Sequence, residues 1–186
     1  EMEKYQMELR TKIILLFLFL FIGCGESGRA TQSVLPTPEV KYTPGDIITD
    51  SQGYISYRVG NMPIIITVPH DGTLAPSTFP DRTGSSARAE NTRKVAERFA
   101  YFFVQNSGGL YPHIVYSNLH RRKLDPNRDI TEGAQGDLGA IQAYNAYHKF
   151  IQTAVDTVEA YFDSGLLLDM HGHAHDIQRI ELGYLL

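Results

Sequence analysis

The sequence predicts an α/β protein with a mostly parallel or mixed sheet that helices cover on both faces. Apolar, strand-like runs alternate with stretches at helical spacing: strand runs at 54–68, 113–119 and 166–175, helical stretches at 87–105 and 139–165. The order strand, helix, strand, helix, strand favours parallel neighbours, because a helix usually carries the connection between parallel strands.

The first strand region divides into two. Tyr54 to Arg58 alternates between apolar and polar residues, and Pro63 to Val68 is a continuous β-branched run typical of a buried strand. Gly60 and Asn61 supply turn residues between them, so we expect a hairpin.

The first helix is expected from Ala87 to Gln105, with Ser85 or Ser86 as its cap. The spacing of its apolar residues predicts which side chains face inward: Val95, Phe99, Phe102 and Phe103.

The second helix follows the strand His113 to Leu119 and the polar segment 120–136. From Gly139 the apolar residues fall at three-four spacing through about seven turns, which Gly165 ends. The residues expected to face the core are Ile141, Tyr144, Ile151, Val155, Val158 and Phe162, with His148 filling the gap.

The N-terminal region predicts export. A basic start precedes the apolar run Ile13 to Ile22, which is too short to cross a bilayer and is typical of a secretory signal. Phe21-Ile22-Gly23-Cys24 resembles the lipobox of bacterial lipoproteins, although Leu is usual where Phe21 stands. We expect a signal at 1–24, a flexible linker at 25–50 and one catalytic domain at 51–186, exported to the cell envelope and held to the membrane by a lipid anchor only. Secretion without lipid, or an anchoring helix, remains an alternative.

The charge and the cysteine content exclude several classes of protein. The chain has 17 Lys and Arg against 21 Asp and Glu, so its net charge of -4 gives no reason to expect nucleic acid as a partner. The single Cys24 excludes an intramolecular disulfide and a cysteine-rich zinc module. Any metal must therefore be held by His and carboxylate.

Three histidines alternate after the last strand, in Asp169-Met-His171-Gly-His173-Ala-His175. On a strand these side chains and Asp169 share one face, at the edge of an α/β sheet where ligands usually bind. Neutral imidazole is the commonest metal ligand, so the pattern predicts a metallohydrolase. Asp169 either orients His171 or is a buried structural acid, and the sequence leaves both open.

Polar residues also follow the other strands: His70 after the first region and the segment 120–128 after the next. Polar residues therefore follow three strands, which is the pattern expected of an active site built from converging loops.

Three motifs carry a resemblance to a known family: Val68-Pro-His-Asp-Gly72, Arg121 with Asp125-Pro-Asn-Arg128, and Leu168-Asp-Met-His171. Together they resemble the N-formylglutamate amidohydrolase family, a branch of the zinc carboxypeptidase-like hydrolases, over about Pro63 to Leu186. The resemblance implies a carboxypeptidase-like fold and a zinc-dependent hydrolase that cleaves an amide bond of an N-acyl amino acid or a small acidic peptide.

The same resemblance implies a zinc site. His70 and His171 would be ligands, and a carboxylate near the first helix would be the third, for which Glu90 is our choice and Asp81 the reserve. Two His and one carboxylate, with an open position for water, is a standard composition for catalytic zinc. Bound water then has a pKa near 7 and the scissile carbonyl is polarised.

The substrate would carry a carboxylate. A guanidinium binds a carboxylate in bidentate fashion, so Asn127 and Arg128 suit an acidic substrate, and the resemblance implies that a further Arg, here Arg121, assists the carbonyl. The same residues are also typical of a surface loop with solvated ion pairs.

A proton-transferring glutamate is expected on a late strand, beyond the Asp-x-His motif. The chain stops at Ile180-Glu-Leu-Gly-Tyr-Leu-Leu186, so we expect the domain to be truncated at its C-terminus, with Glu181 as a substitute or as a structural strand position. The alternatives are an exported metallopeptidase or cell-wall amidase, and a lipid-anchored protein that binds a metal or ligand without chemistry. A serine hydrolase is disfavoured because the chain has no Gly-x-Ser-x-Gly elbow.

Overall fold

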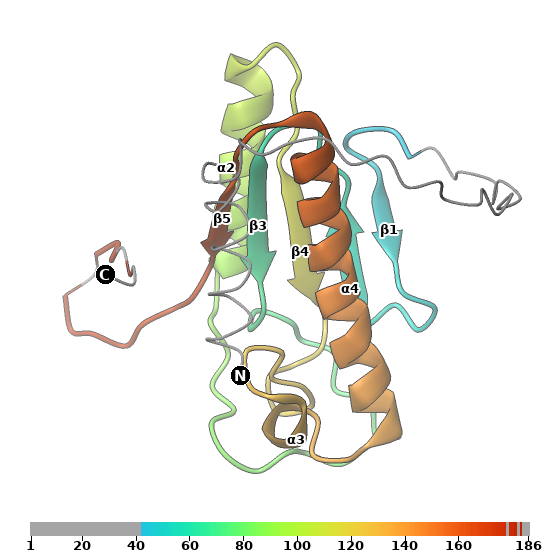
Figure 1. The fold of residues 1–186 in the computed structure, drawn as a ribbon. Helices are drawn as coiled ribbons and strands as arrows, with labels where there is room; N and C mark the ends of the chain where they lie inside the picture. The colour runs from blue at the N-terminus through green and yellow to red at the C-terminus, as the bar shows by residue number, and fades with distance from the viewer. Residues whose placement is uncertain (1–41, 178, 182, 184–186) are drawn as a thin grey trace, which may run out of the picture.

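A five-stranded mixed sheet forms the middle layer of the computed structural model, which describes residues 42–177, 179–181 and 183 (Figure 1). Its order is β1-β2-β4-β3-β5, with bounds β1 Ile47–Thr49, β2 Ile55–Arg58, β3 Ile64–Val68, β4 His113–Ser117 and β5 Leu166–Asp169. Strand β3 runs parallel to β4 and β5, whereas β2 is antiparallel to both β4 and β1. The α/β class and the mixed sheet are therefore confirmed.

Helices lie on both faces of this sheet, as Figure 1 shows. The long helix α4 (Leu138–Tyr161) packs on one face, where Ile65 and Val115 belong to its core. Helix α2 (Thr92–Asn106) packs on the other face, against Ile66 and Ile114. Alternate strand residues thus serve opposite layers, as the two-residue period of a strand requires.

The predicted hairpin is wrong, because β4 lies between β2 and β3. The segment that joins them runs against the start of β4: a Cβ on Gly60 would lie 2.4 Å from the backbone nitrogen of His113. Asn61 donates its backbone N–H to the carbonyl of Tyr111 and accepts the Tyr111 N–H on its side chain. These contacts replace the two-residue turn.

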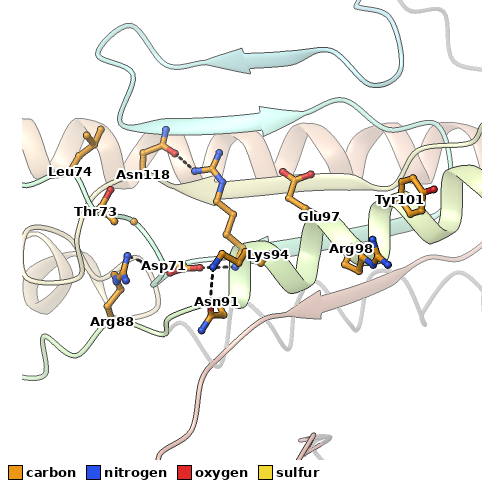
Figure 2. A pocket seen from close by; sticks show the side chains of 12 residues that line it. Asp71, Thr73, Leu74, Arg88, Asn91, Lys94, Glu97, Arg98, Tyr101 and Asn118 are labelled. Atoms are coloured by element: carbon orange, nitrogen blue, oxygen red, sulfur yellow. Dashed lines mark hydrogen bonds and ion pairs between the residues drawn. The ribbon is translucent and has the colours of Figure 1, made fainter.

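Helix α2 begins later than predicted. Asn91, at its N-cap position, has a φ of 70° and makes no side-chain cap, so neither Ser85 nor Ser86 starts the helix. Asp71, from the loop after β3, instead accepts the backbone N–H of Arg93 at 2.8 Å (Figure 2). A residue distant in sequence therefore caps this helix, which local patterns cannot indicate.

The face of α2 that packs on the sheet is also not the predicted one. Ala96 and Ala100 are buried against it, whereas Val95, Phe99 and Phe102 remain 43%, 40% and 53% exposed. Small side chains therefore face β3, and of the four residues predicted to face inward only Phe103 is half-buried.

Helix α4 agrees more closely with its prediction. Asp137 caps it by accepting the N–H of Ala140, and Ile151, Val155 and Val158 are buried as expected. Tyr147, which was not predicted to face the core, is buried instead of the half-buried Tyr144.

The first strand lies within the range expected to be a linker, because β1 pairs with β2 at Ile48 and Tyr57. The predicted signal, Cys24 and the linker up to residue 41 lie outside the described residues. Within the described part of the chain, no helix is both long and apolar enough to cross a membrane.

Candidate functional site

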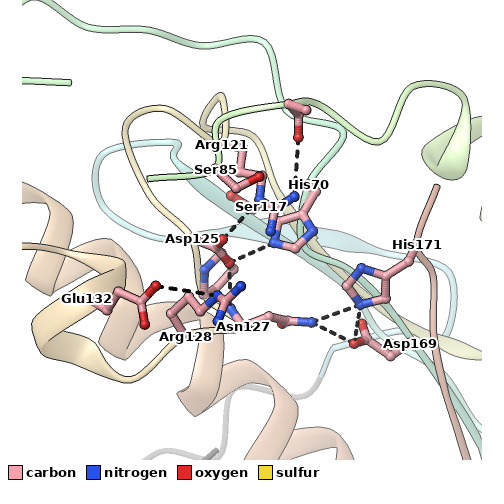
Figure 3. Close-up of polar contacts among 12 residues, drawn as sticks. His70, Ser85, Ser117, Arg121, Asp125, Asn127, Arg128, Glu132, Asp169 and His171 are labelled. Carbon is pink, nitrogen blue, oxygen red and sulfur yellow. Dashed lines mark hydrogen bonds and ion pairs between the residues drawn. The ribbon is translucent and has the colours of Figure 1, made fainter. Parts of the chain in front are cut away.

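Two imidazole rings meet where adjacent parallel strands end (Figure 3). His70 comes two residues after β3 and His171 two residues after β5, and their ring centroids are 5.1 Å apart at an angle of 65°. Because β3 and β5 are parallel neighbours, their carboxyl ends lie at the same edge of the sheet. Two residues far apart in sequence are thereby brought together.

The His70 half of the site is buried. The side chains of His70 and Asp125 are 2% and 0% exposed, and His70 Nε2 lies 2.7 Å from Asp125 Oδ1. Arg121 Nε donates to the other carboxylate oxygen at 2.9 Å, and the backbone N–H of Asn127 donates to Oδ1 at 3.1 Å. The ring's second nitrogen, Nδ1, is buried and has no hydrogen-bond partner among the described residues.

The protonation of this half follows from its burial. Burial lowers the pKa of His70, and the hydrogen bond to Asp125 opposes that shift only in part. Burial alone would raise the pKa of Asp125, but hydrogen bonds from His70 and Arg121 hold it well below its usual range. Asp125 is therefore charged and His70 neutral, with its proton assigned to Nε2 and a lone pair on Nδ1.

The His171 half is more open. The side chains of His171 and Asp169 are 43% and 29% exposed, with His171 Nε2 at 2.7 Å from Asp169 Oδ2. Thr67, which faces Asp169 across the parallel strands, donates its hydroxyl to Oδ1 at 2.6 Å. Asn127 Nδ2 donates to Oδ2 at 2.7 Å and lies 2.9 Å from His171 Nε2. Of the two roles left open for Asp169, orienting His171 is the one observed.

The pKa of His171 moves opposite to that of His70. The hydrogen bond to Asp169 raises the pKa of His171, and burial opposes the rise. Burial acts to raise the pKa of Asp169, but the bonds from His171, Thr67 and Asn127 outweigh it and lower that pKa. The two rings nevertheless have the same kind of partner, since Nε2 of each ring contacts a carboxylate oxygen.

The loops that carry His70 and Asp125 touch through their backbones. A Cβ on Gly72 would lie 2.2 Å from the carbonyl oxygen of Leu119, so only glycine fits there. Leu74 donates its N–H to the carbonyl of Asn118, and His120 donates its N–H to the carbonyl of Leu74. These two hydrogen bonds form an isolated parallel β-bridge between Leu74 and Leu119.

The predicted third ligand does not join the two rings. Glu90 is 68% exposed and lies 3.1 Å from Arg88, and the reserve Asp81 is 53% exposed and bound to Lys123 at 2.6 Å. Among the residues the structure describes, no group of three or more His, Cys, Asp or Glu is arranged to hold a metal ion. The ring pair thus offers two ligands.

The predicted substrate residues have different surroundings. Arg121 is occupied by buried Asp125, and its Nη1 also donates to the carbonyl of Ala87 at 3.4 Å. The Asn127 side chain is taken up by Asp169 and His171. Arg128 alone is open, since it is 49% exposed and 3.7 Å from Glu132.

The C-terminal histidines leave the strand that was predicted to hold them. Strand β5 ends at Asp169, and the residues from His171 to His175 are irregular and exposed, so alternation does not place them on one face. His175 pairs with Glu181 at 2.8 Å, and Arg179 binds the same carboxylate. Glu181 therefore contacts residues of its own segment and neither ring of the pair.

Thr67 was not predicted to be a site residue, and Asp125 was included in a motif without being given a role. The four-residue spacing of Arg121 and Asp125 is compatible with an ion pair, but nothing in the sequence indicates that the carboxylate is buried. Thr67 lies inside an apolar strand, where threonine is an ordinary strand residue.

No protein-family model, curated protein or solved structure matches this chain. The fold and the site therefore define its class by themselves: an α/β protein with a pair of histidines, each held by a carboxylate, at the carboxyl edge of its sheet.

Proposed function

We propose that this protein is a zinc-dependent hydrolase of the carboxypeptidase-like kind, similar to the N-formylglutamate amidohydrolases, that cleaves an amide bond of an N-acyl amino acid or a small acidic peptide. The observation that carries the proposal is the approach of His70 and His171 to a centroid separation of 5.1 Å. Both rings have Nε2 on a carboxylate, which is the arrangement that usually supports metal-binding imidazoles.

The spacing of the rings fits a shared ion. Two imidazoles on one tetrahedral zinc, with Zn–N bonds near 2.1 Å, place their centroids about 5 Å apart. His70 Nδ1 is buried without a partner among the described residues, which is costly unless a ligand occupies it. Zinc at this place would supply an activated water and a polarised carbonyl.

The surrounding residues would position the reactants. Burial keeps His70 neutral, and the hydrogen bond to Asp125 fixes the orientation of its ring. Asp169, which Asn127 holds in place, fixes the orientation of the His171 ring. Arg128, which is half-exposed and loosely paired with Glu132, is free to bind a substrate carboxylate. This division assigns Asn127 to orienting the ring, and leaves Arg128 as the group that selects an acidic substrate.

The proposed location follows from the N-terminal pattern. Cys24 as a lipid-bearing residue would hold the domain at the cell envelope, where acidic cell-wall peptides are more accessible than cytoplasmic N-acyl amino acids. A cell-wall amidase or metallopeptidase is the corresponding activity within the same chemistry.

A second candidate is a metal-binding protein without hydrolytic activity. It is favoured by one observation: Glu181, the predicted proton-transferring residue, binds His175 and Arg179 instead of facing the pair. Zinc binding with no release of amine from any acyl amino acid would support this candidate over the hydrolase.

The test measures zinc content and amide hydrolysis of the purified chain and of three single variants. His70→Ala and His171→Ala are expected to lose stoichiometric zinc, because each removes one ligand. His173→Ala is the matched control, since it lies two positions beyond His171 but contacts Arg179 and His175 instead. Retention of zinc in both ligand variants, or equal loss in the control, would overturn the proposal.

A further inference from the structure

A groove of about 870 Å³ runs along α2 from its N-terminal end, on the side of the strand β4 (Figure 2). Neither ring of the histidine pair lines the groove, but Asp71, which directly follows His70 in the sequence, lies in its wall. Basic side chains dominate its wall: Arg88, Arg93, Lys94 and Arg98, against the acids Asp71 and Glu97.

Both acids of the groove are already neutralised. Asp71 lies 3.7 Å from Arg88 and accepts a backbone N–H, and Glu97 pairs with Arg58 at 2.7 Å. Glu97 also accepts the hydroxyl of Tyr116 at 2.6 Å. Neither carboxylate is therefore available to the remaining cations.

Three cations of the groove have no carboxylate partner in the described part of the chain. Arg93 donates to the Asn118 side chain and stacks on the Tyr116 ring, with its guanidinium carbon 4.5 Å from the centroid. Lys94 donates to the Asn91 side chain, and Arg98 lies over the rings of Tyr101 and Phe102. All their charge-bearing contacts are neutral, so the groove retains a positive potential.

The spacing of these cations suits a ligand with regularly placed anions. Lys94 and Arg98 are four residues apart on the helix, which puts them about 6 Å apart along its axis. Side chains at alternate positions of an extended peptide are about 6.6 Å apart. We propose that this groove binds an acidic peptide in extended conformation, with carboxylates at alternate residues against Lys94 and Arg98.

The groove is a binding surface in addition to the proposed zinc site. Only cleavage of the bound peptide, and not its binding, rests on the proposed function. Asp71 joins the groove to His70 along the chain, so a long acidic substrate that extended past Asp71 to the histidine pair would gain affinity from residues remote from its scissile bond. Binding itself requires no metal.

The experiment measures fluorescence anisotropy of a labelled peptide, Glu-Ala repeated three times, in low salt with EDTA. The intact chain is expected to bind it, and the Gln-Ala counterpart at least about tenfold more weakly. The double variant Lys94→Gln with Arg98→Gln should weaken binding of the Glu peptide by about tenfold, since two partly exposed pairs are removed.

The matched control is Lys149→Gln with Arg122→Gln, which removes the same charge from exposed positions outside the groove. It should change the dissociation constant less than about twofold. An equal loss in both double variants, equal binding of the Gln peptide, or displacement by free glutamate or phosphate at the same anion concentration would overturn the groove proposal. His70→Ala should bind the peptide normally, so failure of hydrolysis and failure of the groove are distinguishable.

Discussion

The two halves of the site have the same chemistry but different surroundings. His70 and Asp125 are 2% and 0% exposed, whereas His171 and Asp169 are 43% and 29% exposed. Burial fixes the first pair with several donors around one carboxylate, while solvent screens the second. The His70 ring is therefore fixed in position, whereas the His171 ring can adjust when a ligand enters the site.

Loss of a carboxylate should destabilise the buried half of the site most. Asp125→Ala should lower the free energy of unfolding by about 3–5 kcal/mol, because it leaves Arg121 and His70 without their shared partner in the interior. Asp169→Ala, its counterpart, should cost about 1–3 kcal/mol, since water can reach His171, although Thr67 is buried and would lose its acceptor. Urea denaturation at pH 7 measures both, and equal losses would show that the halves do not differ in this way.

A second prediction concerns Asn127, which touches both carboxylates. Asn127→Ala removes the amide that holds Asp169 while keeping the backbone N–H that binds Asp125. Zinc affinity should fall about tenfold, as for other groups that orient a metal-binding histidine. Arg128→Ala is the control and should leave zinc affinity unchanged while raising KM for an acidic substrate. Calorimetric titration with zinc distinguishes them, and an Asn127 variant with unchanged affinity would contradict the assigned role.

The pKa values of the two rings provide a third comparison. In metal-free protein, NMR titration should find the pKa of His70 below about 6.5 and that of His171 above it. The stability that His171 contributes is present below its unfolded pKa and is lost as the pH rises through its folded pKa. His70 contributes in the opposite sense, because its stability is present above the unfolded pKa and is lost as the pH falls.

Variants isolate these opposite slopes. His171→Gln should remove part of the stability loss on the alkaline side, and Asp169→Asn should move the pKa of His171 down toward its usual value. Unfolding free energies measured from pH 5 to 9 test the sign. A decline toward high pH that is identical in His171→Gln would contradict the prediction.

The smallest effects are expected from the two exposed glutamates. Glu90→Gln and Glu181→Gln should each leave the midpoint of urea denaturation almost unchanged, because both side chains lie in solvent-accessible ion pairs. Their zinc affinity should match that of the intact chain in the same titration. A large loss in Glu90→Gln alone would show that its carboxylate turns from Arg88 toward the rings when metal binds.

The neighbouring positions of the two rings could be predicted because each follows a strand directly. A residue just after a strand lies at the sheet's carboxyl edge whatever the rest of the fold does, so His70 and His171 needed only adjacent parallel strands. Glu90 lies in a loop before a helix whose start depends on a distant cap, Asp71, and its direction was therefore not predictable.

The core was predictable where large apolar residues recur at helical spacing, as at Ile151, Val155 and Val158 of α4, although the buried alanines of that face, Ala140, Ala143 and Ala154, were not predicted. It was not predictable for α2, which carries aromatic residues on one face and alanines on another. Only the tertiary fit selects Ala96 and Ala100 for the sheet. The insertion of β4 between β2 and β3 was missed for a related reason, since pairing between distant strands leaves no mark at the Gly60 turn.

Gly72 has a consequence for redesign of the protein. Because its backbone lies against that of Leu119, the His70 loop and the segment leading to Asp125 are joined without any side chain between them. The backbone contact sets the position of these two segments relative to each other, so replacement of the surrounding side chains should not change it. An engineer who wishes to alter the histidine pair should therefore vary the residues at the end of β5, and leave the junction at Gly72 untouched.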